Sequence, residues 1–286
     1  MKKRIFAGLL ALLLLAAPLS GCAKKQTAHI DVLATTAPVH AICLALLENT
    51  GLSCGRVITE SVSCLHDYTL TVAQMEKIGQ ADIVVLSGLG LEDFMDDALR
   101  TAPRTITASD GIDTLPGEDG ADPHIWLDPM RCIQMSQNIA AGLQSLYPAQ
   151  AQTIAQNLQA VTGAYTQLQA YGDEALAALS CRKLVTFHDG FSYFADAFGL
   201  EIAAAMEIEH GSEPSAREIE DVVHIVEENQ LPAVFDEVNG ESLTAATVSA
   251  QTGAAVFTLD MGMGEEVSGY TDAIRKNIDT VKEALG

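Results

Sequence analysis

The sequence has few basic side chains and few aromatic ones. Only 16 of its 286 residues are Lys or Arg, against 38 Asp or Glu, so the formal net charge is -22. A surface that binds nucleic acid through phosphate contacts must be cationic, and this composition excludes one. Charged residues are only 19% of the chain and hydrophobic residues 48%, which is the reverse of a disordered acidic chain. We therefore expect a folded protein.

Several motifs that carry chemistry are also missing. The chain has no Gly-x-x-x-x-Gly-Lys-Ser/Thr, Gly-x-Ser-x-Gly, His-Glu-x-x-His or Gly-x-Gly-x-x-Gly. The first absence excludes an ATPase of the P-loop class, and the others leave a serine hydrolase, a zinc protease and a dinucleotide-binding fold without their usual signatures. After residue 22, no stretch is long and apolar enough to span a bilayer.

The first 22 residues read as processing signals. Three basic residues at positions 2–4 precede an apolar stretch over residues 5–17, which is too short for a membrane span and typical of an export signal. Leu19-Ser20-Gly21-Cys22 then resembles the bacterial lipobox, whose Cys is diacylated and becomes the mature N-terminus. We expect an extracytoplasmic protein anchored to the cell membrane through Cys22, because two acyl chains suffice for stable anchoring.

Five cysteines remain in the mature chain, namely Cys43, Cys54, Cys64, Cys132 and Cys181. Outside the cytoplasm a disulfide is permitted, but an odd number leaves at least one thiol unpaired. No pair has metal-finger spacing. Each is interpreted as a buried small hydrophobe or part of a stabilising bridge, and the pairing is left open.

Strand and helix patterns alternate twice along the chain, which predicts an α/β fold of two parallel-sheet lobes. After a polar tether at 23–28, the N-terminal lobe covers 29–148 and the C-terminal lobe covers 180–286. Between them, 149–179 reads as one helix about 45 Å long, which predicts a single backbone helix joining the lobes. The expected strands are 29–35, 56–60, 82–86, 183–187, 202–206, 233–235 and 255–259.

Three histidines occupy comparable positions in this pattern. His66 follows a predicted strand, His124 lies in a Pro-bracketed loop, and His188 lies at a strand-to-helix turn. Ligand sites of open α/β folds gather at the carboxyl ends of the strands, where Asp260 also lies. Together the four side chains would form the shell that borderline divalent cations prefer.

The same regions carry a family resemblance. The segments Leu65-His66-Asp67-Tyr68, 81–94, Asp122 to Pro129, Thr186 to Phe194 and Glu213-Pro214-Ser215 are similar, in this order, to the zinc/manganese solute-binding lipoproteins of bacterial ABC importers. The resemblance implies metal held between two lobes, by His66 and His124 from the first and by His188 and Asp260 from the second. It further implies a membrane permease and a separate ATPase as partners of a monomeric binding protein.

The resemblance also bears on the metal. Members with His at the third ligand position look zinc-selecting and those with Glu manganese-selecting, so His188 favours Zn(II) as the bound substrate, with Mn(II) or Fe(II) as alternatives. Two departures stand out. Residues 113–122 lack the His-rich loop of many zinc members, and Cys64 stands before His66 in place of the family's usual turn, so that Cys64 forms a local bridge or approaches the metal.

The other polar candidates have plainer interpretations. Glu237 follows a strand and either orients a ligand imidazole or is an ordinary strand-end carboxylate. We expect His29, His40, His210 and His224 to be surface or capping residues. Of these, His210 could also belong to a rim of residues that attracts cations to the site. A metallohydrolase is disfavoured, because a catalytic zinc keeps one position open for water. A surface adhesin with the same fold stays open as a secondary role.

Overall fold

The computed structural model describes residues 29–61, 65, 68–117, 120–206, 214–238, 243–264 and 269–286. Within these ranges the strands form two four-stranded sheets, with the orders β2-β1-β3-β4 and β6-β5-β7-β8. Every strand pair is parallel, which confirms the predicted α/β fold. The strands are β1 (Val32–Ala34), β2 (Cys54–Arg56), β3 (Ile83–Leu86), β4 (Thr105–Thr107), β5 (Lys183–Thr186), β6 (Glu201–Ala205), β7 (Ala233–Glu237) and β8 (Ala255–Leu259).

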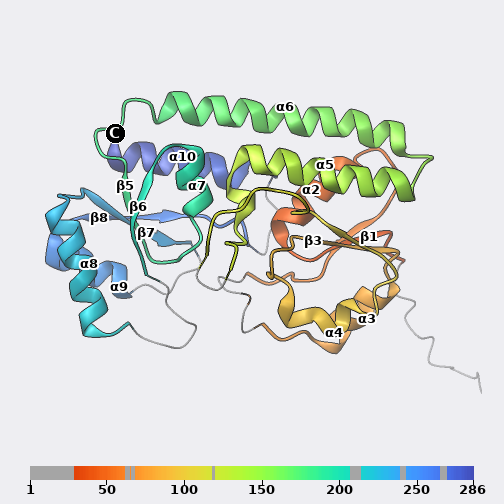
Figure 1. Ribbon diagram of the computed structural model, residues 1–286, viewed down its shortest axis with the longest axis horizontal. Coiled ribbons are helices and arrows are strands. Elements are labelled where there is room, and N and C mark those ends of the chain that lie inside the picture. Colours follow the sequence, from red (N-terminus) through yellow and green to blue (C-terminus); the bar gives the residue numbers. More distant parts are fainter. Residues whose placement is uncertain are drawn as a thin grey trace, which may run out of the picture.

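Helices cover the sheets (Figure 1). Around the first sheet they are α2 (Ala37–Leu47), α3 (Val72–Gln80), α4 (Asp96–Leu99) and α5 (Pro129–Leu146), with two short 3-10 turns, η1 (Asp93–Met95) and η2 (Ile125–Leu127). Around the second they are α7 (Ser192–Ala197), α8 (Ala216–Glu228), α9 (Leu243–Thr252) and α10 (Asp272–Leu285). The central strands β1 and β3 are almost wholly buried, as expected of parallel strands covered on both faces.

Local side-chain chemistry sets where several helices begin. Thr71 and Gln74 form a reciprocal capping box at the start of α3, and Ser215 and Glu218 form another at the start of α8. Both boxes satisfy backbone N–H groups that the first turn leaves without partners. At α5, the Asp128 carboxylate accepts hydrogen bonds from the N–H groups of the next turn, and Pro129 takes the first helical position.

Helix α6 (Ala151–Ala175) runs along the length of the molecule above both sheets (Figure 1). It packs on α2 and α5 of the first lobe and on α10 of the second. The Tyr165 hydroxyl from this helix donates to the carbonyl of Tyr270, 3.0 Å away. Its 25 residues span about 37 Å, so one element contacts both lobes. None of the helices in the described part of the chain is long and apolar enough to cross a membrane.

One large hydrophobic cluster contains buried residues of both lobes, from Val32 to Leu285. Polar contacts also join the lobes. The Trp126 indole donates to the carbonyl of Met261 at 2.7 Å, and the Tyr193 hydroxyl donates to the carbonyl of Asp122 at 2.8 Å. Because apolar packing and buried hydrogen bonds both cross the junction, the two lobes are held in one arrangement.

The first sheet differs from expectation at its edges. The strand expected at 56–60 lies instead at Cys54–Arg56, where Cys54 pairs with Val32 of β1. Strand β4 was not expected, because Thr105–Thr107 is short and only Ile106 is buried in it. Both are edge strands whose pairing partner, rather than their own composition, stabilises them.

Candidate metal centre

His124 stands immediately before η2 and is held by a buried carboxylate. The Asp122 Oδ1 atom accepts from the His124 backbone N–H at 2.9 Å and lies 2.8 Å from the ring Nδ1. Since Asp122 is only 5% exposed, this contact fixes the ring orientation. A carboxylate acceptor places the proton on Nδ1, which leaves the Nε2 lone pair available to a cation. The Trp126 ring packs edge-on against the imidazole, with centroids 5.3 Å apart.

His188 lies in the turn that follows β5. Its Nδ1 is 3.5 Å from Oε2 of Glu237, the last residue of β7, the neighbouring strand. The chain passes close to the ring at Gly190, where a Cβ would lie 2.8 Å from His188 Cδ2 and 2.6 Å from Met261 Cε. A residue larger than glycine at position 190 would therefore push the imidazole out of place.

The two imidazoles meet at the junction of the lobes. The His124 and His188 ring centroids are 5.6 Å apart and the rings are inclined at 83°, an edge-to-face arrangement. Their side chains are 17% and 13% exposed, so both are largely shielded from solvent. Two residues that are 64 positions apart in the sequence, one from each lobe, thus lie together.

Asp260 follows β8 and is anchored to α10. Its backbone exchanges two hydrogen bonds with the fully buried Asn277 amide, at 2.7 and 2.9 Å. Its Oδ1 accepts from the N–H of Gly262, and its Oδ2 is 3.3 Å from the Lys276 ammonium. The sequence pattern did not reveal this lysine counter-ion, because Lys276 lies on a helix distant from the predicted strand ends.

Glu237 lies between these groups and is buried. Its side chain is 2% exposed, and its Oε1 has no hydrogen-bond partner among the described residues. Burial raises the pKa of Glu237 to about 8, and the negative charges of Asp236 and Asp260 add to this. The carboxyl is next to the His188 ring, as expected of a group that orients an imidazole.

The predicted residues are brought together only in part. Among the described residues, His124, His188 and Asp260 are not a group whose ligand atoms all lie within 4.8 Å of one another. His66 lies outside the described residues, as do Cys22, Cys64 and His210. Beside His66, Leu65 is buried, and the Tyr68 hydroxyl donates to the Glu60 carboxylate at 2.8 Å.

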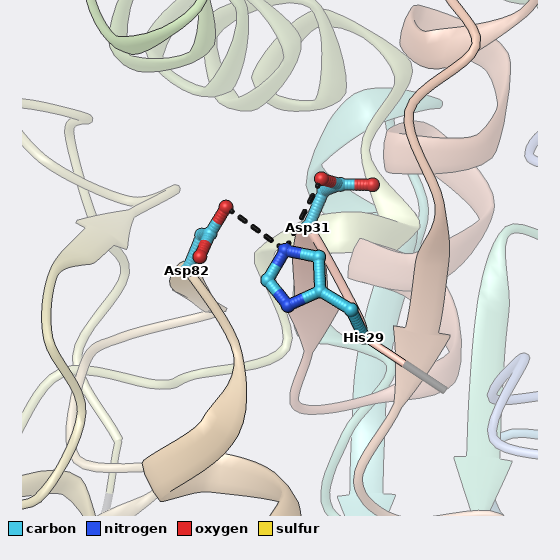
Figure 2. Close-up of side chains that lie close together, drawn as sticks. All are labelled: His29, Asp31 and Asp82. Carbon is cyan, nitrogen blue, oxygen red and sulfur yellow. Dashed lines mark hydrogen bonds and ion pairs between the residues drawn. The ribbon is translucent and has the colours of Figure 1, made fainter. Parts of the chain in front are cut away.

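A compact His/Asp group occurs elsewhere (Figure 2). His29 Nε2 lies 3.2 Å from Asp82 Oδ2 and 3.5 Å from Asp31 Oδ1. All three residues come before β1 or β3 in the chain, so they lie at the amino ends of these strands and not at the carboxyl ends, where ligand sites of such folds gather. The His29 side chain is 60% exposed, and an exposed ion pair contributes little stability. It is a surface residue, as predicted.

The remaining histidines divide into one confirmed and one wrong prediction. His224 on α8 is exposed, 3.8 Å from Glu228 one turn later, which confirms a surface role. His40 was expected at the surface or as a cap. Both of its ring nitrogens are instead buried, because His40 lies on the inward side of α2, toward β2.

The model of the family described as "ZnuA: Zinc-uptake complex component A periplasmic" matches residues 32–284. The chain belongs to the ZnuA family. The resemblance inferred from the motifs is thereby confirmed. A ZnuA-family chain is a solute-binding component of a metal ABC importer, not an enzyme, and it works outside the cytoplasm.

Individual relatives of this ZnuA-family chain carry different metals in their names. It is 30% identical over 239 residues to the zinc-binding protein TroA of Treponema pallidum, covering 77% of this chain and 78% of that protein. It is 29% identical over 244 residues to the iron-binding protein YfeA of Yersinia pestis, covering 80% and 78%. A crystal structure of ZnuA, 24% identical, superposes with a TM-score of 0.80 over 90% of this chain and 99% of that one, and shows the shared fold.

Proposed function

We propose that this protein captures Zn(II) between its lobes and delivers it to a membrane permease that a separate ATPase powers. His66, His124, His188 and Asp260 are the proposed ligands. The observation that carries the proposal is the edge-to-face meeting of the His124 and His188 rings at the junction of the lobes. The names of the relatives support a metal as the substrate and vary in which one, from zinc to iron and manganese.

The donor set favours zinc. Three imidazoles and one carboxylate form a nitrogen-rich shell, whereas manganese favours oxygen donors and binds most sites more weakly. Asp122 keeps the His124 Nε2 lone pair available, and Glu237 sits where it can orient His188. Binding breaks no covalent bond, so release to the permease only requires that the ligands separate.

Binding also changes the local charge pattern. Lys276 holds Asp260 Oδ2 at 3.3 Å, so a cation must take the place of this ammonium before the carboxylate can coordinate it. Protons compete with the metal for the imidazoles as well. Because only an unprotonated imidazole offers its lone pair to the metal, we expect zinc binding to weaken as the pH falls.

A calorimetric zinc titration tests the ligand assignment. We expect one zinc per chain in the wild type and, in His188→Ala, an affinity lower by about 100-fold or more, beyond the roughly 10–100-fold cost of losing an outer hydrogen-bond partner. His224→Ala is the matched control, since His224 is an exposed histidine of the same lobe, and it should bind as the wild type does. Equal losses in the two variants would contradict the assignment.

We propose further that Cys22 anchors the protein to the cell membrane. The lipobox-like segment supports this, and some relatives are named lipoproteins. We also propose that the lobes are the two domains, 29–148 and 180–286, joined by the helical segment 149–179. The anchor keeps the captured metal near the permease, because the tether at 23–28 is short.

A further inference from the structure

Two cysteines of the first lobe lie against each other. Cys43 is fully buried on α2, and Cys54 begins β2, the strand at the edge of the first sheet. Helix α2 packs on β2, and both side chains belong to the same hydrophobic cluster. The side chains of Cys43 and Cys54 interact with each other, and each is the largest single influence on the pKa of the other. The two sulfur atoms are therefore neighbours, on elements whose packing is set by the core.

The two thiols differ in reactivity. The hydrogen bond from Cys43 lowers the pKa of Cys54 to about 6 against the opposing effect of burial, and the neighbouring His40 lowers it further. The same pair interaction and burial raise the pKa of Cys43 well above its ordinary value. Cys54 is thus the more readily ionised of the two thiols, and it is the more exposed of the two. A reactive thiolate beside a buried thiol is the arrangement of an attacking and a resolving cysteine.

The other described cysteines lack this arrangement. The Cys132 thiol is buried on α5 and donates to the carbonyl of Trp126 at 3.1 Å. Burial raises its pKa, so it stays a thiol. The Cys181 thiol donates to the carbonyl of Lys183 at 3.8 Å. All four cysteines that the structure describes, Cys43 and Cys54 included, are free thiols in it.

We propose that Cys43 and Cys54 form a disulfide in the exported protein. Members of this family work outside the cytoplasm, where disulfides form and persist. The bond would tie the middle of α2 to the edge strand β2 and close the loop between them. Strand β2 leads into the segment that ends at His66, so the crosslink would hold that segment's starting point.

The chemistry uses an extracytoplasmic disulfide as the oxidant. The Cys54 thiolate attacks one sulfur of that disulfide, whose S–S bond breaks. A mixed disulfide forms, and the first oxidant sulfur leaves as a thiolate that takes a proton from solvent. Cys43 then loses its proton to solvent and attacks the Cys54 sulfur, which forms the internal bond and releases the second oxidant thiolate. Two protein thiols are oxidised, and one oxidant disulfide is reduced to two thiols.

Thiol mapping of the full chain tests the proposal. The protein is expressed with its own signal, isolated without reductant, denatured in iodoacetamide and digested. We expect a peptide pair linked through Cys43 and Cys54, with Cys132 and Cys181 alkylated. Reductant should abolish the linked pair and lower the unfolding temperature. Full alkylation of both Cys43 and Cys54, or a bridge from either one to Cys64, would overturn the proposal.

Matched variants separate the crosslink from simple packing. Cys54→Ser should lower the unfolding temperature without reductant and make it insensitive to reductant. Cys132→Ser removes a buried thiol from the same lobe, and it should retain both the linked peptide and the response to reductant. The proposal would fail if the stability of Cys54→Ser still fell on reduction. None of these measurements depends on metal binding.

Discussion

At the scale of single residues, the candidate site depends on which atom of each side chain is available. Asp122 and His124 are two positions apart, and their contact assigns the proton to Nδ1 and leaves the lone pair of Nε2 available. His188 lies beside a buried carboxyl group. The residue type at position 188 therefore decides whether nitrogen or oxygen is the third donor atom of the proposed shell.

Replacing His188 with Glu tests whether this donor sets the metal preference. The variant exchanges nitrogen for oxygen, so we expect the ratio of zinc to manganese affinity to fall by about 10-fold or more relative to the wild type. Competition titrations of both metals on both proteins measure that ratio. The zinc affinity alone is not informative, because most protein sites bind zinc more tightly than manganese. An unchanged ratio would show that the third histidine does not decide selectivity.

At the scale of elements, α6 has two glycines in different surroundings. A Cβ at Gly172 would lie 2.2 Å from Cε1 of Phe198, whereas a Cβ at Gly163 would have no atom within 4 Å. Phe198 cannot move away easily, since it is buried and packs on Phe194 with ring centroids 5.1 Å apart. At Gly172 the long helix therefore packs directly against a buried side chain of the second lobe.

Because of this difference, we expect a glycine-to-alanine substitution to have opposite effects on stability at the two positions. Gly163→Ala should raise the free energy of unfolding by about 0.5–1 kcal/mol, because alanine restricts the unfolded chain and favours a helix. Gly172→Ala should lower it by about 1–3 kcal/mol, because overpacking outweighs that gain. Denaturant unfolding of the two variants and the wild type measures both values. A stabilised Gly172→Ala protein would contradict the packing described here.

At the scale of the whole molecule, the two lobes pack against each other as one body. Arg56 of β2 donates to the carbonyl of Gly264 in the second lobe at 3.0 Å, and Trp126 donates to that of Met261. A rigid binding protein of net charge -22 is repelled by anionic headgroups, so charge would not retain it at a membrane. The acyl chains proposed on Cys22 would supply the retention that charge does not.

Replacing Cys22 with Ala tests that anchor. The wild-type protein should sediment with membranes, and the variant should appear in the medium or the periplasm, because it has no site for acylation. Cys181→Ala is a control that removes a cysteine of the folded part and should stay with the membranes. If the Cys22 variant still partitions with membranes after a high-salt wash, the proposed anchor is wrong.

Much of the fold follows from local patterns. The strand expected at 82–86 is β3, and the capping boxes at Thr71 and Ser215 set the starts of α3 and α8 through residues only three positions apart. The displacement of β2 could not be predicted, because Cys54 and Gly55 are weak strand residues that pair only because β1 lies beside them. The burial of His40 could not be predicted for a similar reason, since it depends on which side of α2 faces β2.

Apart from β4, local patterns in the sequence predicted the alternation of strands with helices, the two parallel sheets and the residue types at the strand ends. Hydrophobic periodicity and capping act over a few residues, so they can be read from neighbours in the chain. Tertiary packing, in contrast, brings His124 to His188, Lys276 to Asp260 and the side chain of Cys43 to that of Cys54. Such contacts join distant segments, and their distances are set by the packing of the whole core.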